Sequence, residues 1–217
     1  MNPMKTVLIT GASQGLGRAL ARLLASRGFR LVLNARRPEP LQEIAWELGA
    51  LAIPGDVSEV AEEIVARAGR VDVLINNASE LGPLPMPRLE DYPWDALLRV
   101  FKVNAVAPLH LTQLVLPQMK DRGEGLILNI SSDAATNAYP GWGGYGASKA
   151  ALEHISRTLA VELEGTGVRV EVVDPGEMAT QMHRDAINGG DVSHLPSPES
   201  VAPRIVSLID SAIGEAA

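Results

Sequence analysis

Three side chains between residues 130 and 149 could together handle a proton at a carbonyl group. Tyr145 and Lys149 are four residues apart in a segment with helical spacing, which places them on one helix face. A phenol has an ordinary pKa of ~10, and an ammonium group one helical turn away would lower that pKa by favouring the phenolate. The hydroxyl of Ser132, which follows a predicted strand over residues 125–131, could bind the same oxygen. These residues predict general acid–base chemistry, although an ordinary helix-face pair would show the same spacing.

A glycine-rich loop near the N-terminus could bind a phosphate group. Residues 5–10 are a short apolar run typical of a buried strand, and apolar residues from position 16 onward recur with helical spacing until Gly28. Between them lie Gly11, Gly15 and Gly17, in a GxxxGxG spacing that differs from the general GxGxxG fingerprint. Such glycines let the backbone approach a pyrophosphate, and the helix that follows offers free N–H groups. We therefore interpret the loop as a nucleotide-binding turn rather than a purely structural one.

Two arginines indicate which nucleotide would bind. Arg36 and Arg37 follow a second predicted strand over residues 29–34. A dinucleotide-binding fold usually has a carboxylate here, about 20 residues beyond the glycines, that binds the adenine ribose 2′-hydroxyl. Two guanidiniums without an acid suit a 2′-phosphate instead, so the sequence predicts NADP(H) rather than NAD(H). The alternative is a pair of solvated loop arginines.

The composition argues against several other classes of protein. Of the 217 residues, 46% are hydrophobic and 21% charged, as in an ordinary globular protein. A net charge of −7 without a basic run argues against nucleic acid and anionic membranes as partners, and no apolar run approaches the roughly 18 residues of a membrane span. There is no cysteine, and the histidines show no metal-ligand spacing: His110, His154, His183 and His194. With no signal-peptide pattern at the start, we expect a cytoplasmic protein without a metal site.

Apolar runs alternate with helical patterns along the whole chain. Further strands are predicted at residues 50–53, 71–75 and 168–173, with no internal repeat or linker between them. This alternation is typical of a parallel sheet covered by helices on both faces. We therefore expect a single domain over residues 1–217, an α/β fold with a doubly wound, Rossmann-type sheet.

Capping residues predict where three helices begin. Ser58 is expected to cap one helix, Asp91 to cap a long helix that reaches about residue 121, and Ser197 to begin a last helix. Residues 177–196 show little periodicity and contain two adjacent glycines, so we expect a mobile flap over the substrate.

The long predicted helix contains residues that suit a helix poorly. Pro108 and Pro117 should bend it or break it. Asn104 is either a polar residue satisfied by its neighbours or a deliberate irregularity, and its type alone does not decide between them.

Taken in chain order, these motifs closely resemble those of the short-chain dehydrogenase/reductase family. That family's own glycine loop is TGxxxGxG, which accounts for the departure from the general fingerprint. One difference is Ser79, which stands where the family's NNAG motif has its glycine. The positions that match the family's functional residues are Gly11, Ser13, Gly15, Leu16, Gly17, Asp56, Val57, Asn77, Ala78, Asn104, Ser132, Tyr145, Lys149, Pro175, Gly176 and Thr180.

The resemblance implies a role for each catalytic position. Tyr145 would be the general acid in the reduction of a ketone or aldehyde, and Ser132 would hydrogen-bond the same oxygen. Lys149 would lower the pKa of Tyr145 and hold the nicotinamide ribose. Asn104 would anchor a proton-relay water behind the lysine, and Thr180 would hold the nicotinamide carboxamide.

The resemblance also bears on sheet size and assembly. Many members of the family end in a seventh strand, whereas this chain stops at Ala217 without one. We therefore expect six strands in the order 3-2-1-4-5-6, with the seventh absent. Because that strand helps to build the four-subunit assembly of many relatives, we expect a homodimer through the Asn104 and Tyr145 helices.

Three functions remain open at this point. The first is an NADP-dependent carbonyl reductase, or alcohol dehydrogenase in the reverse direction. The second is a reductase of carrier-bound 3-oxoacyl chains, which wants a basic surface, whereas this chain is acidic overall. The third is a non-catalytic NADP-binding redox sensor, which would be expected to have lost Tyr145 or Lys149. The residues expected to line the substrate pocket are mixed in character and name no substrate: Glu80, Leu81, Asp133, Ala134, Tyr139, Trp142, Glu177, Met178, Met182 and His183.

Overall fold

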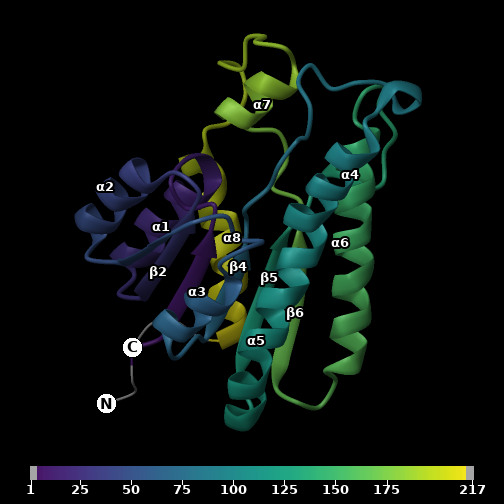
Figure 1. Ribbon diagram of the computed structural model, residues 1–217. Coiled ribbons are helices and arrows are strands. Elements are labelled where there is room, and N and C mark those ends of the chain that lie inside the picture. Colours follow the sequence, from purple (N-terminus) through teal and green to yellow (C-terminus); the bar gives the residue numbers. More distant parts are fainter. Residues whose placement is uncertain (1–3, 214–217) are drawn as a thin grey trace.

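A six-stranded parallel sheet in the order β3-β2-β1-β4-β5-β6 carries the fold, which confirms the predicted strand order. The computed structural model (Figure 1) describes residues 4–213. The strands are β1 (Thr6–Thr10), β2 (Arg30–Ala35), β3 (Leu51–Pro54), β4 (Val73–Asn76), β5 (Gly125–Ile130) and β6 (Val168–Val173). The chain turns back across β1 to reach β4, so the carboxyl ends of these two strands flank the crevice where ligands of open α/β sheets bind.

Helices cover both faces of the sheet, as the alternation of strand and helix patterns predicts. Their bounds are α1 (Gly15–Ser26), α2 (Pro38–Leu48), α3 (Ala61–Ala68), α4 (Trp94–Phe101), α5 (Ala107–Arg122), α6 (Gly143–Glu162), α7 (Gln181–Ala186) and α8 (Pro198–Ile213). One hydrophobic cluster joins the sheet to α1, α2 and α8, and a second joins it to α3 and α5. No helix in the described part of the chain is both long and apolar enough to cross a membrane.

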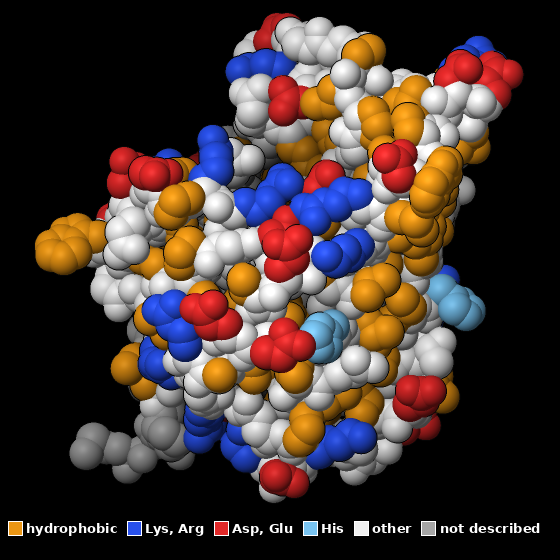
Figure 2. All heavy atoms as spheres, viewed as in Figure 1, with side chains coloured by type: hydrophobic (Ala, Val, Ile, Leu, Met, Phe, Trp, Pro, Cys, Tyr) orange, Lys and Arg blue, Asp and Glu red, His pale blue; other side chains and the backbone are white. Residues whose placement is uncertain are grey.

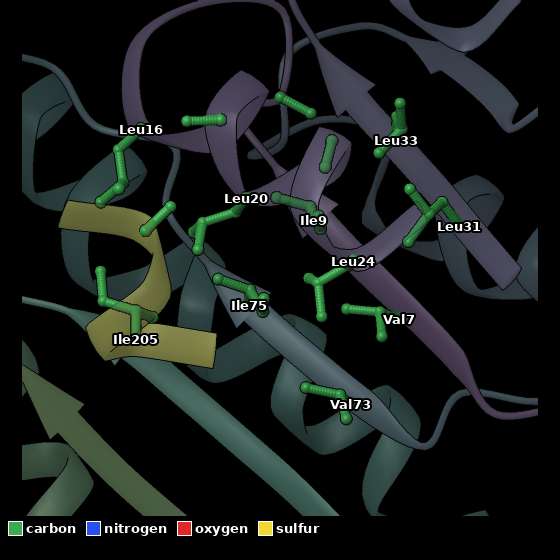
Figure 3. Packing of buried hydrophobic residues seen from close by; sticks show 14 of the residues in the cluster. Val7, Ile9, Leu16, Leu20, Leu24, Leu31, Leu33, Val73, Ile75 and Ile205 are labelled. Carbon is green, nitrogen blue, oxygen red and sulfur yellow. The ribbon is translucent and has the colours of Figure 1, made fainter. Parts of the chain in front are cut away.

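Alternation of side chains along the strands explains why both faces are apolar. Val7 and Ile9 belong to the cluster with α1 and α8, whereas Leu8 belongs to the opposite cluster. Leu16, Leu20 and Leu24 lie one turn apart on α1 and close over the first of these faces (Figure 3). Burying a leucine of this size stabilises the fold by about 1.5–3 kcal/mol, so this packing fixes α1, and with it the glycine loop, against β1.

The long helix predicted from residue 93 to about 121 is interrupted, but not by a proline kink. Helix α4 passes into a π-helical turn, Lys102–Val106, before α5 begins. In this turn the N–H of Ala107 donates to the carbonyl of Lys102, five residues back. The next residue, Pro108, has no N–H to give, which favours the wider turn at this place. Pro117 lies inside α5 without ending it.

Two predicted caps are wrong. The N–H and hydroxyl of Ser58 both donate to Asp56 Oδ1, at 3.0 and 2.7 Å, while α3 begins only at Ala61. Asp91 lies in a 3-10 turn, Leu89–Asp91, and the first position before α4 is taken by Pro93. At Ser58 the local turn with Asp56 competes with the cap for the same side chain.

The segment over residues 177–196 is more regular than predicted, because it contains α7. Thr180 caps this helix by accepting from the N–H of His183 at 3.1 Å. The Ala179 N–H donates to the Pro196 carbonyl at 2.9 Å and closes the base of the segment. In Figure 1, α7 stands above the carboxyl ends of the strands, away from the helices that cover the sheet.

Candidate functional site

A cavity of about 600 Å³ opens at the carboxyl ends of the central strands. At one end lie Arg36, Arg37 and Asp56, and at the other lie Ser132, Tyr145 and His183. The predicted cofactor-binding residues line it except for Gly17: Gly11, Ser13, Gly15, Leu16, Arg36, Arg37, Asp56, Val57, Asn77, Ala78, Tyr145, Lys149, Pro175, Gly176 and Thr180.

The glycine loop forms a cradle at the start of α1. No side chain caps the helix at Gln14, and its first turn contains no acidic residue, so its N–H groups remain available for an anion. Gly11 has φ +66°, and a Cβ there would approach Ala78 Cα to 2.9 Å. Gly17 has a different task, since a Cβ on it would collide with the Gly11 carbonyl oxygen. This third glycine lets α1 pack closely against the loop, and it does not line the cavity.

The loops after β1 and β4 are tied together under the cavity. Thr10 Oγ1 accepts from the N–H groups of Asn77 and Ala78 at 3.1 and 3.0 Å. The Asn77 side chain donates to the carbonyls of Thr10 and Gly11 at 2.9 and 3.2 Å. These hydrogen bonds hold the two loops together at the base of the crevice. The Asn77 side-chain NH2 group is therefore engaged with the backbone of the glycine loop.

Arginines gather at the end of the cavity next to β2. Arg36 forms an ion pair with Glu80 at 3.0 Å, and the Arg37 guanidinium hydrogen-bonds Gln14 Oε1. Asp56 pairs with Arg99, a residue of α4. Burial opposes ionisation of Asp56, but the hydrogen bonds from Ser58 and Arg99 outweigh it and lower the pKa of this carboxyl.

Ser132, Tyr145 and Lys149 come together at the other end. Ser132 follows β5, whereas Tyr145 and Lys149 lie in the first two turns of α6, which begins at Gly143. Burial raises the pKa of Tyr145 to about 12, against hydrogen bonds from Ser79 and Ser132 that lower it; the charges of Asp174 and Asp133 add to the rise. Burial also lowers the pKa of Lys149 to about 8.

The pKa of Tyr145 is thus raised in this structure, whereas the sequence predicts that Lys149 lowers it. Lys149 Nζ donates to the Ile130 carbonyl at 2.8 Å and lies 5.7 Å from the centre of the tyrosine ring. Desolvation of the phenolate is the dominant effect on Tyr145, and it drives the pKa up instead of down.

Asn104 lies behind the cavity, inside the π-helical turn. Its backbone therefore departs from the regular α-helix, and its side-chain amide has hydrogen-bond partners at both atoms. Its Nδ2 donates to the Glu80 carbonyl and to Ser148 Oγ, each at 2.9 Å. Its Oδ1 accepts from the Glu80 N–H at 2.8 Å and from Ser79 Oγ at 3.3 Å. The side chain thus pins the segment that follows β4 to α6.

The expected substrate pocket is only partly as predicted. Leu81, Asp133, Trp142, Glu177, Met178, Met182 and His183 line the main cavity. Glu80 instead pairs with Arg36, while Ala134 and Tyr139 line a separate cavity of about 450 Å³. Tyr139 donates to Asp133 at 2.7 Å, and this bond lowers the pKa of that carboxyl.

Sequence reasoning missed two residues that take part in the site. Ser79 lies on the cavity wall and hydrogen-bonds Tyr145, and its departure from the NNAG motif was a signal that pointed to it. Arg99 gave no signal, because its partner Asp56 lies 43 residues earlier in the chain. The described residues contain no group of three or more His, Asp or Glu placed to hold a metal ion.

Comparison with known proteins agrees with this arrangement. The chain is 38% identical to a short chain dehydrogenase of Pseudocercospora fijiensis, over 85% of this chain but only 63% of that protein. It is 33% identical to the 3-oxoacyl-(acyl-carrier-protein) reductase FabG of Thermotoga maritima, over 94% of this chain and 89% of that one. A solved structure of the closed form of serine dehydrogenase complexed with NADP+ superposes with a TM-score of 0.85 and 30% identity, over 94% of this chain and 88% of that one. Residues 5–189 match the family model described as short chain dehydrogenase. The chain belongs to the short-chain dehydrogenase/reductase family of oxidoreductases.

Proposed function

We propose that the protein is an NADP(H)-dependent oxidoreductase that reduces a ketone or aldehyde, or oxidises the corresponding alcohol. The observation that carries this proposal is the meeting of Ser132, Tyr145 and Lys149 at one end of a cavity whose other end holds Arg36 and Arg37. A reacting carbonyl and a phosphorylated nucleotide would thus find their partners in the same space.

The residues present fit a bound dinucleotide. The uncapped start of α1 suits a pyrophosphate, and the cavity beside it is wide enough for a ligand of this class. Arg36 and Arg37 suit the 2′-phosphate, and NADP+ in the related serine dehydrogenase structure supports the same choice. At the far end Pro175, Gly176 and Thr180 would hold the nicotinamide.

The bound cofactor would supply the hydride, and the protein would manage the proton. In reduction, the Tyr145 hydroxyl gives its proton to the carbonyl oxygen as negative charge develops there. Ser132 now donates to Asp133 Oδ1 at 3.2 Å, so its hydroxyl must turn to share the substrate oxygen. Lys149 is one turn from the tyrosine and places a positive charge near the developing phenolate.

The decisive experiment follows NADPH consumption with a panel of ketones and aldehydes, using wild type and Tyr145→Phe. The variant keeps the ring and loses the acid, so its rate should fall on the order of 10²–10⁴-fold, while NADPH binding persists. Near-wild-type reduction by Tyr145→Phe would show that the catalytic assignment is wrong and would favour the redox-sensor alternative.

Carrier-bound 3-oxoacyl chains are a second candidate substrate class, because the name of one relative gives them as its substrate. The Thermotoga protein is a reductase of 3-oxoacyl chains on acyl carrier protein. Here the substrate end of the cavity carries the carboxylates Asp133, Asp174 and Glu177, which would repel an acidic carrier. We therefore favour a small free carbonyl compound, and comparing a 3-oxoacyl carrier protein with its short thioester analogue in the same assay distinguishes the two.

We also propose a homodimer formed through α4, α5 and α6. Trp94 and Leu98 on α4, Val106 before α5 and Val161 on α6 are large apolar side chains that are more than half exposed. Figure 2 shows hydrophobic side chains gathered along the edge formed by these helices. Such a surface suits a second copy of the chain better than water. Location in the cytoplasm stays a prediction from the sequence.

A further inference from the structure

Two arginines and two carboxylates form a linked cluster at the adenine end of the cavity. Arg36 Nη1 donates to Glu80 Oε2 at 3.0 Å, and Arg99 Nε donates to the same oxygen at 3.4 Å. The other side of the Arg99 guanidinium pairs with Asp56. Figure 2 shows basic and acidic side chains interleaved in the middle of this face, below α7.

The Arg36–Glu80 pair crosses the nucleotide crevice. Arg36 directly follows β2 and Glu80 follows β4, with β1 and its glycine loop between those strands. An anion bound by the loop and reaching toward Arg36 therefore meets the Glu80 carboxylate at the same guanidinium.

The charges around Arg36 set up a competition. Arg36 and Arg99 are balanced by Glu80 and Asp56, so this cluster is neutral, and Arg37, hydrogen-bonded to the neutral Gln14, adds one positive charge. A 2′-phosphate brings about −1.5 to −2 at neutral pH. It must either displace the carboxylate from Arg36 or share the guanidinium with it.

The backbone of Glu80 cannot simply move away. Asn104 holds both its N–H and its carbonyl, at 2.8 and 2.9 Å. Arg99 holds the carboxylate from the α4 side, and the Glu80 side chain is only 21% exposed. Exchange at Arg36 is therefore a change of side-chain partners on a fixed backbone.

We infer that Glu80 is a specificity-determining residue of the nucleotide site, which competes with the 2′-phosphate of NADP(H) for Arg36 and so weakens NADP(H) binding without affecting NAD(H). The inference rests on the proposed preference for NADP(H). Glu80 reduces that preference, and Arg99 holds the Glu80 carboxylate within hydrogen-bonding distance of Arg36.

The experiment measures binding of 2′,5′-ADP and 5′-AMP by calorimetry at low and high salt, for wild type, Glu80→Gln and Arg36→Met. These probes differ only in the 2′-phosphate. Glu80→Gln should bind 2′,5′-ADP about two- to fivefold more tightly, the effect expected of removing a partly exposed charge, with 5′-AMP unchanged and the gain shrinking in salt. Glu90→Gln is the matched control, because Glu90 pairs with Arg88 at 3.0 Å on the exposed surface and should change neither affinity.

The possible results separate the inference from the proposed cofactor. If wild type prefers 2′,5′-ADP, Arg36→Met loses that preference and Glu80→Gln changes nothing, the cofactor proposal stands and the role of Glu80 is overturned. If wild type binds both probes equally, the NADP(H) preference falls and the inference falls with it. A structure with NADP+ bound in which Arg36 keeps its full contact with Glu80 would also overturn the competition.

Discussion

Lys149 Nζ donates to the Ile130 carbonyl at 2.8 Å, not to the hydroxyl of its neighbour Tyr145. Both side chains are buried, and burial favours the neutral form of each: it raises the pKa of the phenol to about 12 and lowers that of the amine to about 8. Near pH 7 the pair therefore consists of a neutral phenol and a mostly protonated amine, and a further positive charge from a ligand would shift the phenol toward ionisation.

The first prediction concerns ionisation of Tyr145. Without nucleotide it should titrate above the ordinary pKa of ~10, and NADP+ should lower that pKa because the nicotinamide ring carries a positive charge. In alcohol oxidation the rate should rise with pH through this ionisation, and in reduction it should fall, since the phenol must then be protonated. Ultraviolet difference titration of wild type against Tyr145→Phe isolates the signal from the two other tyrosines. An unchanged pKa with NADP+ would contradict the prediction.

The second prediction is that Lys149→Met stabilises the protein while it destroys activity. Lowering the lysine pKa from 10.5 to about 8 costs roughly 3 kcal/mol of folding free energy below pH 8. Losing the bond from the charged amine to the Ile130 carbonyl offsets about 1–2 kcal/mol of this, which leaves a gain of about 1–2 kcal/mol, or roughly 2–8 °C in Tm.

The pH dependence of that gain provides the control. Between pH ~8 and ~10.5 the unfolded wild type binds more protons than the folded one, so wild-type stability should rise with pH. The advantage of Lys149→Met should therefore be greatest below pH 8 and fade by pH ~10.5. An equal or lower Tm at pH 7 would show that the lysine is better solvated than its burial implies.

A third prediction concerns the segment over residues 177–196. It stands above the cavity on a base closed at Ala179 and Pro196. Ala186 of α7 belongs to the hydrophobic cluster that includes Tyr145, and Met182 packs against that cluster. NADPH should tighten this packing and slow amide hydrogen exchange in the segment, while α8 serves as the internal reference. Exchange rates that do not respond to saturating NADPH and substrate would argue against a lid.

A fourth prediction concerns assembly. Leu98→Glu places a charge in the exposed apolar surface of α4 and should convert the dimer to monomers in sedimentation experiments. Trp46→Glu is the matched control, because Trp46 is 87% exposed on α2, away from that surface. A mass near four chains for wild type at micromolar concentration would refute the dimer.

Strands and motif positions could be predicted from the sequence because each depends on local patterns. The residues of β1 are buried on both faces of the sheet, which gives a short apolar run in the sequence. The glycines that follow lie between a strand and a helix, where a nucleotide-binding turn is the usual reason for such spacing. The ionisation of Tyr145 could not be predicted, because residue spacing places Lys149 on the same helix face but says nothing of how deeply both are buried. Helix α7 was missed because six residues carry little periodicity and its Thr180 cap and packing come from the tertiary fold.

The π-helical turn at Lys102–Val106 sets the rotational phase of α4 relative to α5. A π turn accommodates one residue more than an α turn would, and each residue turns an α-helix by about 100°. Deleting a single residue here would let the two helices merge into one regular helix and would swing Arg99 off Asp56 and Glu80. The position of Asn104 behind the cavity and the ion pairs of Arg99 with Asp56 and Glu80 thus depend on the same extra residue, and a change in the length of this turn would alter both.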